Sequence, residues 1–342
     1  MRRLAFAIGV LLALPAVPLS IFAATTPLSG VGFLYVIGTL LVIGGLLTAP
    51  RRVRRRRGVT RAGLAVIALA MVVRIAFAGH GKTIAMTRRG PGAPLLDRLL
   101  PEDDVATTSA RAVIWAGILP ANDTKNLVPT LRRSFQRMNE AEGSYPSPIA
   151  MTSLGLQRRE AFDTLEIAAP AADTKAAVLF LHGYGGNFTL QCWMVAQAAR
   201  RAGAATFCPS TRLTGDWWSA DGRHVVGEMM TDLRARGFDR IVLSGLSNGG
   251  VGASRIAPSL RGKIVGLLLI SGAAPDAGAP GVPAIAFEGG QDTMMTPGAV
   301  RRYAENGGVT YVELEGTHFL LIEKRDEMTE RMSAWLVARF PR

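Results

Sequence analysis

The sequence predicts an α/β protein: a mostly parallel sheet with helices on both faces, preceded by two or three helices that span a membrane. Two observations lead to this class. From about residue 159 onward, short apolar runs alternate with stretches of helical spacing and are joined by short links. Ahead of them, three long apolar runs occupy the first 80 residues.

The three N-terminal apolar runs cover about residues 4–24, 30–49 and 62–79. The second holds no charge and is long enough for the roughly 20 residues that cross a bilayer core. The third holds one charge, Arg74, which fits a side chain that snorkels to the interface. The first run has two interpretations. With MRR before it and SIFAA at its end, it is either a retained span or a cleaved secretory signal peptide.

The positive charge of the chain is concentrated near these runs. The 342 residues carry an excess of 13 positive charges, yet nine arginines and no lysine, aspartate or glutamate lie in residues 1–61, which leaves an excess of only four elsewhere. Seven of these arginines lie in RRVRRRRGVTR. This segment has no interleaved aromatic residues and no recognition motif, so it does not indicate a nucleic-acid site. Arginine-rich loops stay in the cytoplasm. We therefore expect everything after about residue 79 on the extracytoplasmic side.

The chain is expected to have three parts. Residues 1–79 form the transmembrane region, 80–158 a juxtamembrane linker with an accessory helical segment, and 159–342 the α/β domain. In the middle part, apolar residues at helical spacing over 127–138 predict a helix, and Gly143 supplies its stop.

Within 159–342 the apolar pattern predicts seven strands, over residues 161–169, 176–183, 203–209, 240–247, 264–272, 282–290 and 309–315. Helices are expected between and after them, over residues 188–201, a stretch that ends near 237, and residues 251–260, 297–308 and 323–340. Strands that alternate with helices predict a parallel sheet with both faces covered.

The stretch GLSNGGVG holds the strongest single motif. Gly245-x-Ser247-x-Gly249 follows an expected strand and opens an expected helix, as a nucleophile elbow requires. The glycines relieve crowding around a tight turn that lifts the serine hydroxyl above the sheet. A phosphate-binding loop would need a lysine here, and none is present. Alone, the motif also fits a helix packed closely on a strand.

Two further residues complete the pattern at later strand ends. Asp292 lies in GGQD and His318 in GTHF, so the order is serine, acid, histidine. Alone, Asp292 fits a helix N-cap and His318 a half-buried loop residue. Together they predict a serine nucleophile, its base and an orienting acid. The backbone N–H groups of Asn248 and Tyr184 are the expected oxyanion donors, with Gly185 as an alternative to Tyr184.

LHGYGGN, GLSNGG, GGQD and GTHF together resemble the α/β-hydrolase superfamily, in particular its cap-free esterases of the phospholipase/carboxylesterase or dienelactone-hydrolase type. The resemblance covers about residues 159–342. It implies a serine hydrolase that cleaves carboxylic esters through an acyl-enzyme, with no cofactor and no metal. Asn248 departs from the glutamine or methionine that such esterases often carry after the serine.

Two alternatives stay open at this point. One is an acyltransferase or peptidase with the same triad, and the other is a non-catalytic binding or sensor protein of this fold. The expected partners are a small-molecule or lipid ester and the membrane that the N-terminal helices enter, with no nucleic acid.

Two pairs of residues have two interpretations each. Trp217 and Trp218 lie in a loop that would rim the active site, where they would form a substrate-binding wall or pack beneath the loop. Cys192 and Cys208 would form a disulfide in an oxidising compartment, or each would serve as a small buried apolar residue.

Overall fold

The structure, a computed structural model, describes residues 2–47, 53–79, 81–91 and 95–340. The chain divides into two compact units. Unit 1 consists of Met1–Gly79 with Arg98–Ile118, and unit 2 of His80–Asp97 with Leu119–Arg342. Arg51 and Arg52 of the predicted arginine loop, and the last residues of the second predicted span, lie outside the described residues.

Unit 1 is helical. Its helices are α1 (Arg2–Ala24), α2 (Gly30–Leu47), α3 (Val53–Phe77) and α4 (Glu102–Trp115). Helix α2 and residues Arg57–Phe77 of α3 are long and apolar enough to cross a membrane. Helix α1 bends by 52° between Phe6–Leu14 and Ala16–Ala23, and it would add a third span if both halves count as one.

Small residues let α2 and α3 approach closely. A Cβ atom on Gly63 would meet the Gly38 carbonyl oxygen at 2.7 Å and the Val42 nitrogen at 2.7 Å. A Cβ atom on Gly45 would meet the Thr60 side chain. Glycines at helix contacts are the usual means of close packing between membrane helices.

Helix α4 lies in a segment that the sequence predicts as a linker, and it is hydrogen-bonded to the link between α1 and α2. Asp104 accepts from the Ser29 N–H at 2.9 Å and from the Ser29 hydroxyl at 2.5 Å. Arg111 donates to the Thr26 hydroxyl at 2.9 Å. These bonds fix a polar helix against the ends of apolar ones.

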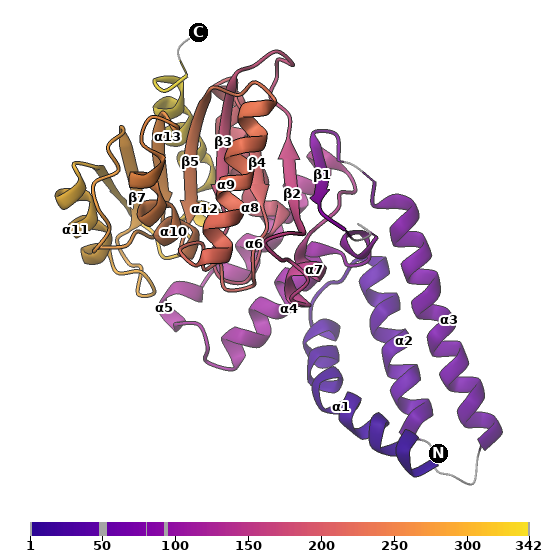
Figure 1. Cartoon of the computed structure of the whole chain (residues 1–342). Helices are drawn as coiled ribbons and strands as arrows, with labels where there is room; N and C mark the ends of the chain where they lie inside the picture. The colour runs from indigo at the N-terminus through magenta and orange to yellow at the C-terminus, as the bar shows by residue number, and fades with distance from the viewer. Residues whose placement is uncertain (1, 48–52, 80, 92–94, 341–342) are drawn as a thin grey trace. The chain divides into compact units, whose positions relative to one another are not determined.

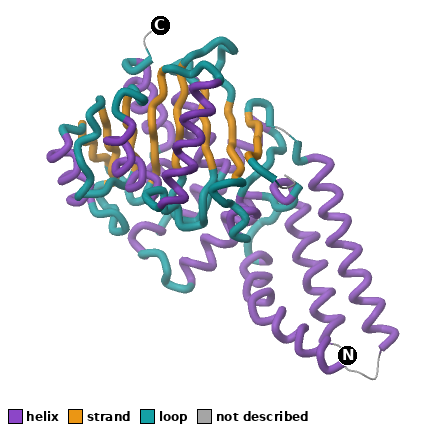
Figure 2. The backbone as a smooth tube through the Cα atoms, viewed as in Figure 1, coloured by secondary structure: helices purple, strands orange, loops and turns teal. Residues whose placement is uncertain are grey.

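Unit 2 is built on one mixed sheet of eight strands in the order β1-β2-β4-β3-β5-β6-β7-β8. Strands β1 and β2 pair antiparallel, β2 and β4 pair antiparallel, and the remaining pairs are parallel. Figure 2 shows the strands side by side with helices in front of and behind them. The strands are β1 (Ile84–Arg89), β2 (Phe162–Ile167), β3 (Ala176–Leu181), β4 (Ala205–Pro209), β5 (Arg240–Leu246), β6 (Gly266–Ile270), β7 (Ala284–Gly289) and β8 (Thr310–Leu314).

The seven predicted strands are all present, and the mostly parallel sheet with helices on both faces is confirmed. Strand β1 is an addition that the sequence analysis did not predict. It is a half-buried edge strand, and its two arginines form ion pairs within unit 2. Arg88 binds the buried Asp163 at 2.7 Å, and Arg89 binds Asp232 at 3.3 Å.

Helices cover both faces of the sheet (Figure 1). Helices α8 (Thr189–Arg201) and α13 (Arg325–Val337) pack against each other on one face. On the other face, α9 (Ala220–Ala235), α10 (Asn248–Ile256) and α11 (Pro297–Gly307) bury apolar side chains in a shared core with the central strands. The remaining short elements of this region are η3 (Ala257–Leu260) and α12 (Leu320–Glu323).

The segment before β2 forms η2 (Leu96–Arg98), α5 (Ala121–Thr124), α6 (Leu127–Glu142) and α7 (Ile149–Ser153). Helix α6 ends at Glu142 and is capped by Gly143, whose φ of 77° is in the left-handed region. The buried Glu142 accepts from the Thr83 N–H at 2.7 Å and from the Trp193 indole at 3.1 Å. Residues 119–158 are thus packed onto the α/β part of unit 2.

Candidate active site

Ser247 lies in the turn between β5 and α10, in a strained backbone conformation. Its φ is 54° and its ψ is −121°, values that a residue with a side chain rarely adopts. The turn is possible because Gly245 and Gly249 have no side chains. A Cβ atom on Gly245 would collide with the Gly249 carbonyl, and one on Gly249 would collide with the Leu181 carbonyl. This geometry is a nucleophile elbow, with the hydroxyl at the carboxyl end of a central strand.

His318 and Asp292 form a continuous hydrogen-bonded relay with this serine. His318 Nε2 lies 2.9 Å from Ser247 Oγ, and His318 Nδ1 lies 2.7 Å from Asp292 Oδ2. We assign the ring hydrogen to Nδ1, which leaves Nε2 to accept from the serine hydroxyl. The histidine and the aspartate are buried, whereas Ser247 is partly exposed. The structure therefore brings the three predicted catalytic residues together at one edge of the sheet.

Asp292 is held as an anion by its donors. Burial raises the pKa of this carboxyl, but the hydrogen bond and charge of His318 and the hydrogen bonds from Glu288 and the Met295 N–H outweigh burial, so the pKa lies below its usual value. Asp292 Oδ1 accepts from the Met294 N–H at 2.7 Å and from the Met295 N–H at 2.8 Å. An ionised Asp292 suits a role in orienting the imidazole.

Glu288 is a second carboxyl beside Asp292, and sequence reasoning did not select it. Its side chain has no exposed surface, and its Oε1 accepts from the Gly289 N–H at 3.1 Å. Burial, followed by the hydrogen bond and charge of Asp292, raises the pKa of Glu288 to about 10. Two close carboxyls in a buried site do not both ionise, and the one with fewer donors keeps the proton. A glutamate within the apolar run AIAFEG was the signal in the sequence.

The two predicted oxyanion donors lie next to the serine. Asn248 is the first residue of α10, and Tyr184 follows Gly183, where a Cβ atom would lie 3.0 Å from Ser247 Cβ. Among the described residues, neither the Tyr184 N–H nor the Asn248 N–H has a protein hydrogen-bond acceptor. The Gly185 N–H donates to the Leu213 carbonyl at 2.8 Å. The geometry therefore favours Tyr184 over the alternative, Gly185.

His182 has a structural place beneath this turn. Burial lowers its pKa to about 4, so the ring is neutral at pH 7. Its Nδ1 lies 2.8 Å from the Gly183 carbonyl oxygen, and its Nε2 accepts from the Thr211 N–H at 3.2 Å. A neutral ring with the hydrogen on Nδ1 satisfies both contacts.

Trp217 does not form the predicted substrate-binding wall. It has no exposed surface, its indole N–H donates to the His182 carbonyl at 2.8 Å, and its ring contacts the His182 ring edge-on. Both α9 and α10 bring a glycine against it, which leaves no room for a substrate. Trp217 packs beneath the loop, and the physical reason is its indole hydrogen bond inside the core. Trp218 is partly exposed, with the Arg255 guanidinium 5.6 Å above its ring.

A polar pocket of about 680 Å³ lies beside the serine turn. Leu213 and Thr214 line it, and their carbonyls accept from the Gly185 N–H and from the Asn248 side chain at 2.8 Å. The other residues of its lining are polar or small: Thr152, Ser153, Gly155, Gln157, Arg158, Arg159, Glu160, Thr211, Arg212, Asp216 and Asp221. Neither the triad residues nor Tyr184 and Asn248 line this pocket. It adjoins the proposed oxyanion donors through Leu213 and Thr214, which makes it a candidate substrate cleft.

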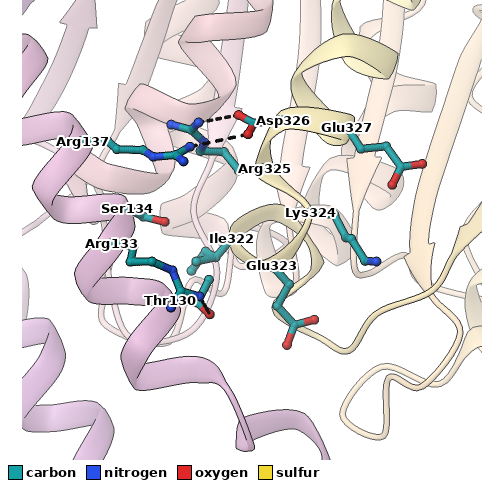
Figure 3. Close-up of a pocket in the computed structure, with 10 residues that line it drawn as sticks. All are labelled: Thr130, Arg133, Ser134, Arg137, Ile322, Glu323, Lys324, Arg325, Asp326 and Glu327. Atoms are coloured by element: carbon teal, nitrogen blue, oxygen red, sulfur yellow. Dashed lines mark hydrogen bonds and ion pairs between the residues drawn. The ribbon is translucent and has the colours of Figure 1, made fainter.

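A smaller pocket of about 290 Å³ lies between α6 and the start of α13 (Figure 3). Figure 3 shows Arg137 and Arg325 both directed at Asp326, and the Arg137–Asp326 distance is 3.5 Å. Glu323 lines this pocket and accepts from the Thr317 N–H at 2.9 Å, next to His318. None of the predicted site residues lines it, and its connection to the site is the bond from the Thr317 N–H to Glu323.

Cys192 of α8 and Cys208 of β4 form a disulfide. Both side chains are fully buried. The bridge decides between the two interpretations of these cysteines. Among the described residues, no group of three or more metal-binding side chains is placed to hold an ion.

No family model and no curated protein matches the sequence. Several solved structures resemble the chain in fold. An α/β serine hydrolase without a lid from Xanthomonas campestris is 19% identical, with a TM-score of 0.45, and the match covers 54% of this chain and 91% of that one. A monoacylglycerol lipase from Paleococcus ferrophilus is 15% identical, with a TM-score of 0.43, over 52% of this chain and 99% of that one. A thermostable esterase is 18% identical, with a TM-score of 0.42, over 52% and 58%. By its own strand order and the strained turn at Ser247, unit 2 has the α/β-hydrolase fold that the sequence motifs predict.

Proposed function

We propose that this protein is a membrane-anchored serine hydrolase that cleaves carboxylic esters on the extracytoplasmic side. The observation that carries the proposal is the unbroken relay from Ser247 Oγ through His318 to Asp292, at 2.9 and 2.7 Å. A serine hydroxyl alone is a weak nucleophile, and an adjacent base oriented by an acid is what activates it.

In the first half of the reaction, Ser247 Oγ attacks the ester carbonyl carbon while His318 Nε2 takes the hydroxyl proton. The carbonyl oxygen becomes an oxyanion, and Asp292 stabilises the imidazolium that forms. The tetrahedral intermediate then collapses. His318 returns the proton to the leaving alkoxide, which departs as an alcohol and leaves the acyl group on Ser247.

In the second half, His318 Nε2 takes a proton from water as the water oxygen attacks the acyl carbon. The second tetrahedral intermediate collapses, and the proton returns to Ser247 Oγ as the carboxylic acid leaves. The Asn248 and Tyr184 N–H groups, which have no acceptor within the described part of the chain, are the proposed donors to the oxyanion in both halves. Donors of this kind are worth roughly 3–4 kcal/mol each to the transition state.

The lining of the candidate substrate cleft favours a substrate that has a short acyl chain or a polar group near the ester. Among the described residues that line it, Leu213 is the one large apolar side chain, whereas Arg158, Arg159 and Arg212 offer hydrogen-bond donors. A long alkyl chain would gain little there, because stabilisation by burial grows with the apolar area that is covered. We expect esters of small acids, or esters of polar molecules, rather than long-chain lipids.

Two independent features support the extracytoplasmic side. The arginine-rich segment between the second and third apolar runs favours a cytoplasmic position for that segment. The buried Cys192–Cys208 disulfide fits an oxidising compartment, since cytosolic thiols are kept reduced.

Activity is tested with the full chain in detergent and p-nitrophenyl esters of increasing acyl length. We expect hydrolysis, with kcat/KM highest for acetate or butyrate and lower for decanoate. Ser247→Ala removes it, whereas Ser244→Ala, a buried serine three residues earlier without a hydroxyl partner among the described residues, keeps it. A folded wild type without esterase activity would refute the proposal. A rise of kcat/KM with chain length would refute the short or polar substrate alone.

Sidedness is tested separately with a phosphatase fused after residue 90. This enzyme is active only outside the cytoplasm, so an active fusion is the expected result. An inactive fusion that is stably produced, or free thiols on both Cys192 and Cys208 in freshly lysed cells, would contradict the placement.

A further inference from the structure

Asp123 is a buried carboxylate that reaches the triad from outside the sheet. It lies in α5, a helix of four residues that precedes α6. Its side chain has no exposed surface. A buried carboxylate requires hydrogen-bond donors, and here the donors come from the two loops that carry the triad acid and the triad histidine.

The first contact is with the loop that carries the acid. Asp123 Oδ1 accepts from the Thr293 N–H at 3.2 Å, and Asp123 Oδ2 accepts from the Thr293 hydroxyl. Thr293 directly follows Asp292 in the chain. The carboxylate therefore fixes both the backbone and the side chain of the residue next to the triad acid.

The second contact is with the loop that carries the histidine. The same Asp123 Oδ1 accepts from the backbone N–H of His318 at 3.0 Å. The Asp123 carbonyl oxygen accepts from the Thr317 hydroxyl at 3.2 Å. One residue thus binds the acid loop and the histidine loop at once.

The hydrogen bonds between β7 and β8 end before the chain reaches Asp292 and His318, so the sheet does not hold these two loops together at the triad. The pairing of β7 with β8 ends at Gly289 and Leu314, and two more bonds follow, the last from the Gln291 N–H to the Gly316 carbonyl at 2.9 Å. Beyond these points, within the described residues, the loops are joined by the His318–Asp292 bond and through Asp123.

We propose that Asp123 is a positioning residue that clamps the acid loop to the histidine loop and so sets the His318–Asp292 geometry. The inference rests on the proposed function. The clamp acts on the backbone of His318 and on the neighbour of Asp292, and Asp123 itself takes no part in the chemistry.

The chemistry of the clamp explains why a carboxylate occupies this place. Two backbone N–H groups and one hydroxyl donate to its two oxygens. Asparagine keeps one oxygen for the two N–H groups, and its amide can donate to the Thr293 hydroxyl. Alanine offers no partner to any of the three donors. Asp123→Asn therefore keeps most of the clamp, and Asp123→Ala removes it.

The first test compares steady-state kinetics of the full chain with p-nitrophenyl butyrate, corrected for the folded fraction. We expect Asp123→Ala to lower kcat by about a hundredfold, because a displacement near 1 Å costs that much. KM should change by less than about threefold, and Asp123→Asn should restore kcat to within about tenfold of wild type. Loss of kcat in Asp123→Asn equal to that in Asp123→Ala would overturn the clamp.

The second test asks whether Asp123 acts through the relay. In the Asp292→Asn background the relay is already broken, so Asp123→Ala should lower kcat by less than about threefold more. A full hundredfold loss in both backgrounds would mean that Asp123 acts independently of Asp292, which contradicts the proposal.

A matched control separates positioning from general stability. Asp163 is also fully buried, with partners Arg88 and Gln157 at the other edge of the sheet. Asp163→Ala should lower the melting temperature while the folded protein keeps its kcat. An inert wild type would refute the proposed function itself, whereas an active wild type with an unaffected Asp123→Ala would refute only the clamp.

Discussion

The His318 ring donates its Nδ1–H to Asp292 Oδ2 at 2.7 Å, between two buried residues that follow neighbouring strands of the sheet. This bond fixes which ring nitrogen faces Ser247. Because the relay depends on the charge of the acid as well as on its shape, the bond can be probed by a substitution that keeps the shape.

Asp292→Asn replaces the anion with a neutral side chain of the same size. We expect kcat for p-nitrophenyl butyrate to fall by about 10⁴-fold, because an amide partner favours the wrong tautomer of the histidine. KM and the melting temperature should change little. Asp276→Asn, an exposed aspartate paired with Arg255, is the matched control and should leave kcat unchanged. A loss of less than tenfold in Asp292→Asn would contradict the role given to Asp292.

Glu288→Gln tests the neutral carboxyl beside Asp292. Burial and the neighbouring Asp292 raise the pKa of Glu288 to about 10 in the folded protein, whereas in the unfolded chain the carboxyl has its ordinary pKa of 4.5. The unfolded state thus binds fewer protons in this window, so Glu288 lowers the stability of the wild type as the pH rises from about 4.5 to about 10.

In Glu288→Gln, the side-chain amide does not titrate in this pH range. Glu288→Gln should therefore melt at a higher temperature than the wild type at pH 8, and the difference should shrink at pH 5. Thermal melts followed by circular dichroism at both pH values measure it, with shifts of roughly 2–4 °C expected for each kcal/mol. If the melting temperature of the variant relative to wild type is instead lower at pH 8 than at pH 5, Glu288 is ionised in the folded protein.

The disulfide should stabilise unit 2 by limiting the unfolded chain. Cys192 and Cys208 are separated by 16 positions, and a bridge across a loop of this size is worth about 3 kcal/mol. The double variant Cys192→Ala/Cys208→Ala should melt roughly 10 °C lower and keep its kcat below that temperature. An unchanged melting temperature under non-reducing conditions would indicate that the bridge does not form.

Trp217→Phe separates packing from substrate binding. The substitution keeps an aromatic ring in the core but removes the indole hydrogen bond to the His182 carbonyl. Stability should fall by about 1–3 kcal/mol, because a buried acceptor loses its partner. KM should stay within about twofold across the ester series. A severalfold rise in KM without a loss of stability would indicate that Trp217 contacts the substrate, which contradicts the packing role.

The sequence predicts the sheet and the relay because both depend on local signals. Each strand is a short apolar run, and Ser247, Asp292 and His318 each lie in a motif at the end of such a run. Parallel strands carry those ends to one edge of the sheet, so their order along the chain was enough to bring them together. The division of the chain at residues 79 and 158 stays a prediction.

Other features depend on distant partners, which a local pattern does not contain. Strand β1 pairs with β2, which begins 73 residues after the end of β1, and it has no continuous apolar run of its own. Asp123 belongs to a stretch, PANDT, that looks like a turn, and its role comes from loops about 170 and 195 positions later. The burial of Trp217 likewise follows from the glycines of α9 and α10 that enclose it.

The most direct measurement is the site of covalent labelling by a fluorophosphonate, which reacts with activated serines. The full chain is incubated with the probe and digested, and the modified peptide is identified by mass spectrometry. The account predicts one adduct on Ser247, absent in Ser247→Ala and strongly slowed in Asp292→Asn. A folded protein that takes up no label, or that carries it on another residue, would contradict the proposal that Ser247 is an activated nucleophile.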